Sequence, residues 1–224
     1  MTRHLTRVGT AAAVAAVAAA AALVGCAAPA AAPATDHDAE LAAMMKASFH
    51  DRGIATVDRL VQDDSDAACS KAMGAPLPAA LAARLQQEAA ATVRPPADGR
   101  YIGDWRVGEK LAQNGRGMTW TDKSAAPSAN GANCYNCHQL APQEISYGTL
   151  GPSLYGYGRL RGVTDLASPT AKAVIEYTWA KLYNAKAYNA CSGMPRFGAH
   201  HLLDDRQLAD VMALLLDPQS PVNR

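Results

Sequence analysis

This chain of 224 residues is organised around the stretch Cys134-Tyr135-Asn136-Cys137-His138. The stretch has the form C-x-x-C-H, which is the pattern that attaches a c-type haem. Two thiols on one turn can form thioethers with the two vinyl groups of a haem, and the histidine that follows can offer an imidazole nitrogen to the iron. A covalently bound haem needs no large pocket to retain it. The motif therefore predicts one haem c, bound through Cys134 and Cys137 and with His138 as an axial ligand.

Two other kinds of site use a C-x-x-C pair. A thioredoxin-like redox motif requires a βαβ context, and no alternation of strands and helices surrounds residue 134. A structural zinc site requires four ligands, usually including a second pair of Cys or His at short spacing. The remaining cysteines are isolated from one another: Cys26, Cys69 and Cys191.

The N-terminus has the composition of an export signal. Residues 1–7 are basic and contain no acid, and residues 8–25 are almost all Ala and Val. A basic start followed by a short apolar run is typical of a secretory signal peptide rather than a membrane span. Leu23-Val24-Gly25-Cys26 resembles a bacterial lipobox, in which Cys26 would carry a lipid; ordinary cleavage within residues 27–34 is the alternative. We expect a periplasmic protein that contacts a membrane only if Cys26 is lipidated.

The net charge excludes a strongly charged binding surface. A formal net charge of +1 provides no strong field for nucleic acid or an anionic membrane.

The sequence predicts four segments. Pro95 and Pro96 interrupt the helical pattern and mark the boundary between the extension and the haem domain. The predicted organisation is a signal peptide (1–26), an Ala/Pro tether (27–37), a helical N-terminal extension (38–98) and a cytochrome c domain (99–224).

The extension reads as helical. Asp38 is a candidate N-cap for a first helix, and Pro78 suits the first turn of a later one. Between them, residues 63–66 form a loop or capping cluster. Three methionines of the extension are expected to be packing residues rather than haem ligands: Met44, Met45 and Met73.

The haem domain is predicted to be all-α, of the class I cytochrome c type. Asp104 caps a short helix in which Gly108 would allow close approach of another helix. Asp204 and Gln207 have the spacing of a capping box at the start of the C-terminal helix. Ser168 caps a further helix between the two. A short N-terminal helix that crosses a C-terminal helix is the expected frame around the motif.

Met194 is the predicted sixth ligand of the iron. It lies in a loop between helices, whereas Met212 lies in the apolar stripe of the last helix, where a core role is expected. His200 and His201 are the rival ligands. A neutral, soft thioether favours Fe(II), so His/Met ligation raises the potential and suits electron transfer.

Residues around the predicted iron ligands are expected to orient His138, to pair with the haem propionates or to line the haem site. The carbonyl of Pro152 is a candidate acceptor for the second ring N–H of His138. Arg159 or Arg161 could pair with a haem propionate, or be an ordinary surface arginine. Three aromatic residues could wall the haem or fill the core: Trp179, Tyr183 and Tyr188.

Cys69 and Cys191 remain after haem and signal are assigned. In an oxidising compartment such a pair predicts a disulfide, which would link the extension to the ligand loop. The alternative is a free Cys191 thiol that ligates iron or reacts with sulfur species.

The haem motif, the loop around Met194 and the C-terminal residues together resemble those of one known family of cytochrome subunits. The chain resembles the X subunits of the SoxAX cytochrome complexes of bacterial thiosulfate oxidation over nearly all of residues 100–224. The most specific part is the segment with Asn-Ala-Lys and Cys-Ser-x-Met-Pro-Arg-Phe-Gly, and the lipobox is a departure from the usual soluble pattern. The similar stretches are 131–139, 151–158, 183–198 and 214–223.

The resemblance implies a division of labour. A SoxA-like dihaem or monohaem subunit would hold the active site, and the pair would act as an L-cysteine S-thiosulfotransferase. That reaction joins thiosulfate oxidatively to a cysteine of a SoxYZ-like carrier protein. This chain would contribute no catalytic residue; it would accept the released electrons and pass them to a small soluble cytochrome c. A free-standing electron carrier and a ligand-sensing haem protein are the alternatives.

Overall fold

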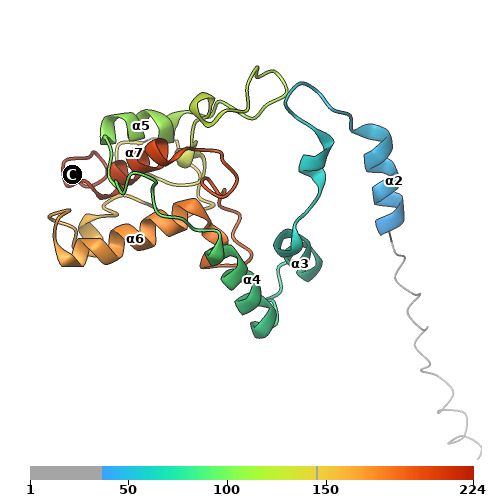
Figure 1. Ribbon diagram of the computed structural model, residues 1–224, viewed down its shortest axis with the longest axis horizontal. Helices are drawn as coiled ribbons and strands as arrows, with labels where there is room; N and C mark the ends of the chain where they lie inside the picture. Colours follow the sequence, from blue (N-terminus) through green and yellow to red (C-terminus); the bar gives the residue numbers. More distant parts are fainter. Residues whose placement is uncertain (1–36, 145) are drawn as a thin grey trace, which may run out of the picture. The chain divides into compact units, whose positions relative to one another are not determined.

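The computed structural model describes residues 37–144 and 146–224 (Figure 1). The predicted signal peptide, Cys26 and all but the last residue of the tether lie outside the described residues. Within the described part the chain is all-α: it has helices and one isolated bridge between Arg52 and Ala55, but no strand. None of the described helices is both long and apolar enough to cross a membrane. The α-helices are α2 (Asp38–Ser48), α3 (Asp64–Ala72), α4 (Ala79–Ala91), α5 (Trp105–Gln113), α6 (Pro169–Tyr183) and α7 (Asp205–Leu216).

Five short 3₁₀ turns complete the described elements, and the chain separates into two compact units. Helix α2 belongs to the first unit, which ends at Ser48, and buries none of its side chains. The second unit is Phe49–Arg224, so most of the predicted extension belongs to the same unit as the predicted haem domain. The 3₁₀ turns are η1 (Val57–Leu60), η2 (Pro127–Ala129), η3 (Cys134–Asn136), η4 (Arg159–Arg161) and η5 (Ala185–Ala187).

Helices α5 and α7 cross and pack against each other within the second unit (Figure 1). A Cβ at Gly108 would lie 2.0 Å from the carbonyl oxygen of Asp210, so glycine is required for this close approach. The side chain of Asp210 accepts a hydrogen bond from the Asp104 amide (2.8 Å), which ties the start of α5 to α7. The predicted N-cap at Asp104 and the capping box of Asp204 and Gln207 are both present.

Helix α6 contributes aromatic side chains to the core. The predicted cap at Ser168 is present, with Pro169 as the first helical residue. Trp179 is buried and its Nε1 donates to the Arg94 carbonyl (2.7 Å); Tyr183 is buried beside it. Tyr188 is exposed and packs edge-on against Tyr177. Trp179 and Tyr183 are therefore core residues.

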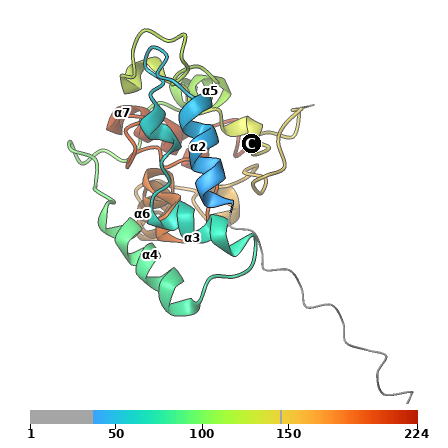
Figure 2. The same ribbon diagram turned by 90° about the vertical axis from the view of Figure 1, so that its right-hand side faces the viewer.

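Helices α3 and α4 pack against the segment that follows α6 (Figure 2). Leu85 of α4 is buried, and Asn184 Nδ2 donates to Thr92 Oγ1 (3.0 Å) at the end of α4. Met73 does not pack as predicted: its side chain is 90% exposed. The reason is local, because Met73 is the left-handed C-cap of α3 (φ 47°) and follows the last helical turn.

Cys69 and Cys191 form the predicted disulfide, so the alternative of a free Cys191 thiol is wrong. The bond closes an interval of 122 residues between α3 and the loop after α6. Constraining a loop of this length in the unfolded chain stabilises the fold by about 4–5 kcal/mol on the chain-entropy model.

A thiol titration checks this bond in solution. We expect the denatured, unreduced protein to show no reactive thiol at Cys69 or Cys191, and dithiothreitol to release both. Urea unfolding with and without dithiothreitol should show a loss of stability of roughly 2–5 kcal/mol on reduction. The Cys69→Ser variant should no longer respond to the reductant. Reactive thiols at both positions before reduction would contradict the pairing.

Candidate functional site

The C-x-x-C-H motif forms a single tight turn. Its 3₁₀ segment η3 begins after Asn133, whose left-handed backbone (φ 51°) turns the chain into the motif. The Cys134 carbonyl accepts hydrogen bonds from the amides of Cys137 (3.0 Å) and His138 (2.9 Å). The Ala132 amide, two residues before the motif, donates to Leu111 of α5 (2.9 Å). The turn is thus anchored to the α5–α7 crossing and brings both thiols and the imidazole into one short stretch.

The segment 148–154 runs back along the motif and holds it in place. Three backbone amides of this segment donate to carbonyls in and beside the motif, each at 2.8 Å. The pairs are Gly148 to Tyr135, Gly151 to Cys137, and Leu154 to Gln139.

The ring of His138 is fixed by a backbone acceptor. Its Nδ1 lies 2.6 Å from the carbonyl oxygen of Pro152, which is the contact that the sequence suggested. Because a carbonyl oxygen can only accept, Nδ1 carries the proton in this contact and Nε2 keeps its lone pair. Such a partner fixes the tautomer and the ring orientation of a metal-binding histidine.

Gly151 leaves room for this ring. A Cβ at Gly151 would lie 2.1 Å from His138 Cε1 and 2.5 Å from Nδ1. These distances are well inside van der Waals contact, so either the ring or the segment 148–154 must move when a side chain is added.

We expect Gly151→Ala to displace the His138 ring and weaken its hydrogen bond to Pro152. Overpacking of this kind costs typically 1–3 kcal/mol, measurable as a loss of stability to urea. Gly193→Ala is the matched control, since no atom lies within 4 Å of its added Cβ. Equal stability of the two variants would contradict the tight fit.

Neither motif cysteine is engaged in a disulfide, although the other pair in the described chain is oxidised. Burial raises the pKa of the Cys134 thiol to about 12. Thioredoxin-type cysteines have instead a lowered pKa, which makes the thiolate available. Among residues 37–144 and 146–224, no three His, Cys, Asp or Glu side chains gather to hold a metal ion. Both motif thiols are therefore free in the described structure, and the pKa of Cys134 differs from that of a thioredoxin-type cysteine.

Met194 and its rivals lie in different surroundings. Met194 is half-buried and packs against the same hydrophobic core as Cys134. Met212 is wholly buried in α7, in agreement with a core role. His200 and His201 are exposed in the turn before α7. Although His200 is exposed, partial desolvation of its ring, followed by the nearby charge of Arg196, lowers the pKa of this residue.

The two candidate propionate partners sit together on η4 and are exposed. The guanidinium of Arg161 lies over the ring of Tyr157 (3.7 Å) and donates to its carbonyl (3.1 Å). The guanidinium of Arg159 is 5.6 Å from the ring of Tyr155. Both therefore have an aromatic neighbour and remain open to solvent.

The donors of the motif fit a haem c, since they are two unpaired thiols and a histidine with a fixed tautomer. Met194 offers a thioether from the loop after α6. Beside the motif, Leu150 is 89% exposed and Tyr147 is also exposed. The thioethers would come from Cys134 and Cys137, and the axial ligands from His138 and Met194.

The structure shows a charged cluster beside the loop that carries Met194, which the sequence analysis did not predict. Asp63 and Asp66 pair with Lys186 and Arg196, more than 100 residues away in the chain. The only local signal was the spacing of the two acids at the start of α3.

Asp63 is held ionised within this cluster. Burial disfavours its charge, but the Asp66 amide and the Arg196 and Lys186 cations outweigh burial and keep the pKa of Asp63 well below its usual value. Its contribution to stability is therefore present above the unfolded pKa of about 3.9 and is lost as the pH falls below it.

Comparison with known proteins found no matching family model but found a related protein. No protein-family model matches the chain. An uncharacterized lipoprotein of Aquifex aeolicus (strain VF5) is 36% identical over 163 residues, which is 73% of this chain and 73% of that protein. At this identity and coverage, the chain belongs to the same family as the Aquifex aeolicus lipoprotein.

Proposed function

We propose that this chain is an exported monohaem cytochrome c that transfers electrons as the X-type subunit of a SoxAX-like complex. The observation that carries the haem assignment is the arrangement of the motif. Cys134 and Cys137 are free thiols on one turn, and the ring of His138 is oriented by Pro152 (2.6 Å) with Nε2 left as a ligand. The class I cytochrome c fold is part of the proposal, supported by the crossing of α5 and α7 beside this turn.

The chain's own residues would hold the group and set its potential. The two thiols would retain it covalently, and the Pro152 carbonyl would raise the basicity of the His138 ring. When bound, a haem supplies reversible one-electron exchange at iron. Filling both axial positions with His138 and Met194 would leave no vacant position for a substrate, so the role is electron transfer rather than catalysis at this centre.

Met194→Ala tests the ligand assignment. We expect the near-infrared sulfur-to-iron band of the oxidised protein to disappear and the reduction potential to fall. The fall should be on the order of 0.1–0.3 V, within the ~0.8 V range over which axial ligands set haem potentials. Met73→Ala is the matched control, because that methionine, the C-cap of α3, is 90% exposed. A band that survives in Met194→Ala would show that another residue is the ligand.

The cellular setting follows from the N-terminal sequence and the relative. Export would bring the chain to the compartment in which the Cys69–Cys191 disulfide persists. The lipobox at residues 23–26 and the relative's name of lipoprotein support lipidation at Cys26 and a periplasmic, membrane-anchored location. The thiosulfate pathway is supported by the resemblance of residues 100–224 to SoxAX X subunits.

A tagged pull-down from the native host tests the complex. We expect a second c-type cytochrome in equal yield, identified by haem staining and peptide mass mapping, and reduction of this chain's haem by thiosulfate in the presence of the carrier protein. The SoxA-like subunit, the SoxYZ-like carrier and a small soluble cytochrome c are the expected partners. Recovery of this chain alone, with its haem, would instead support a free-standing electron carrier.

A further inference from the structure

The segment that carries Met194 has little backbone support of its own. Among the described residues, the N–H groups of Gly193 and Met194 and the C=O groups of Gly193, Met194 and Pro195 form no backbone–backbone hydrogen bond. The Met194 amide donates only to the Ser192 hydroxyl (3.3 Å), which belongs to the same loop. The side chain of Met194 packs against the core, but the position of its backbone depends on what holds the residues on either side of it.

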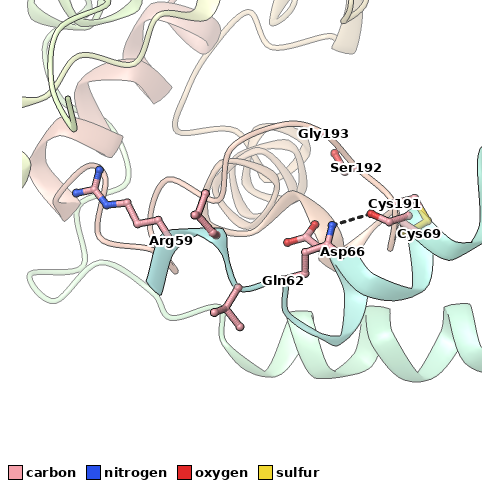
Figure 3. A pocket seen from close by; sticks show the side chains of 10 residues that line it. Arg59, Gln62, Asp66, Cys69, Cys191, Ser192 and Gly193 are labelled. Atoms are coloured by element: carbon pink, nitrogen blue, oxygen red, sulfur yellow. Dashed lines mark hydrogen bonds between the residues drawn. A yellow bond between two sulfur atoms is a disulfide. The ribbon is translucent and has the colours of Figure 1, made fainter. Parts of the chain in front are cut away.

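Helix α3 holds the residues on the N-terminal side. The Ser65 hydroxyl is buried and donates to the carbonyl of Ala190 (2.6 Å). Cys69 forms the disulfide with Cys191, three residues before Met194. Figure 3 shows this disulfide at the edge of an open hollow, with Asp66 from α3 and Gly193 from the loop close by.

The same helix holds the C-terminal side through charge. Arg196, two residues after Met194, pairs with both Asp63 and Asp66, the latter at 3.2 Å. Lys186, at the start of the loop, pairs with the same two carboxylates although its side chain is only 5% exposed. A buried ammonium requires such partners, since removing one leaves an uncompensated charge.

The contacts come from one face of the helix. Asp63, Asp66 and Cys69 are spaced three residues apart, so their side chains project to the same side of α3. All three contact the loop at 186–196, at points that bracket Met194. We call these three residues and Ser65 the α3 clamp.

We infer that the α3 clamp positions Met194 as the iron ligand and makes that ligation sensitive to thiol reductants. The inference rests on the proposed function. A dithiol reductant would transfer two electrons and two protons to the disulfide, which becomes the Cys69 and Cys191 thiols while the dithiol becomes a disulfide. Cys191 is exposed beside the open hollow, so a small reductant has access. The freed loop would then release Met194 and open the iron to external ligands.

The test compares four holo-proteins: the unmodified chain, Cys69→Ser with Cys191→Ser, Asp66→Asn, and Glu88→Gln. The last is the matched control, since Glu88 pairs with Arg84 on the exposed surface of α4 (2.6 Å). Only variants whose far-UV circular dichroism shows native helix content are compared. Three quantities are measured: the near-infrared sulfur-to-iron band, the rate of CO binding to the reduced protein, and hydrogen exchange of amides 191–198.

We expect both clamp variants to lose most of the band, bind CO at least about tenfold faster, and exchange amides 191–198 at least about tenfold faster. Tenfold corresponds to 1.4 kcal/mol of local stability. The control should match the unmodified chain, and dithiothreitol should convert the unmodified chain to the behaviour of the disulfide-free variant. Asp66→Asn keeps the disulfide. It therefore tests the α3 clamp by itself if the variant with both Cys69→Ser and Cys191→Ser fails to fold.

The two possible failures can be told apart. A chain that carries no haem overturns the proposed function, whereas exchange at 191–198 still measures the clamp. A native-like band and unchanged exchange in both clamp variants overturn this inference and leave the haem assignment in place. A haem-containing unmodified chain without the band overturns Met194 as ligand and this inference with it.

Discussion

Replacing Cys134 and Cys137 together with alanine is expected to abolish covalently bound haem. Both thiols are unpaired and lie on the η3 turn, where they are available to form thioethers. Without them only the axial ligands could retain the group. Haem staining after denaturing electrophoresis should fall from one haem per chain to background, a loss of at least about tenfold. Pyridine haemochrome spectra of the purified protein measure the same quantity.

Two controls separate attachment from folding. The disulfide-free variant, Cys69→Ser with Cys191→Ser, should keep its haem, because those cysteines pair with each other and not with the motif. The single variants Cys134→Ala and Cys137→Ala should each keep one thioether and an intermediate yield. Full haem content in the double alanine variant would contradict the assignment of the motif.

The second large effect is expected at Gly108, where α5 crosses α7. Any Cβ here would lie 2.0 Å from the Asp210 carbonyl oxygen and 3.1 Å from Leu214 Cβ. Backbone on both sides of the contact cannot move aside as a flexible side chain could. We expect Gly108→Val to destabilise the fold by roughly 3 kcal/mol or more.

Thermal unfolding measures this effect. For a domain of this size, 3 kcal/mol corresponds to a Tm lower by roughly 6–12 °C. Gly193→Ala is again the control, because its added Cβ meets no neighbour. A Gly108→Val variant with the Tm of the unmodified protein would show that the two helices do not approach each other in this way.

Local rules explain why much of the fold could be predicted. The caps at Asp104, Ser168 and Asp204 depend on residues within three positions of each other, so the sequence contains all the information needed. The motif turn and the Pro152 contact are likewise short in sequence. The Cys69–Cys191 pair spans the chain, but elimination left few possible partners.

Other features depend on long-range packing that no local pattern contains. Lys186 reads as an ordinary surface lysine, and only the docking of α3 makes it a buried partner of Asp66. Met73 was expected to be a packing residue, but it lies just after the last turn of α3 and faces solvent. Trp179 suited either a haem wall or the core, and its hydrogen bond to Arg94 places it in the core.

The most direct test of the central claim is the mass of the peptide containing residues 134–138 after expression with a haem-attachment system. The account predicts that this peptide carries one haem through two thioethers, and that the oxidised protein shows the near-infrared sulfur-to-iron band. The same peptide is then mapped in the protein purified from its native host. An unmodified mass there, with both cysteines open to alkylation, would contradict the assignment of a haem c to this site.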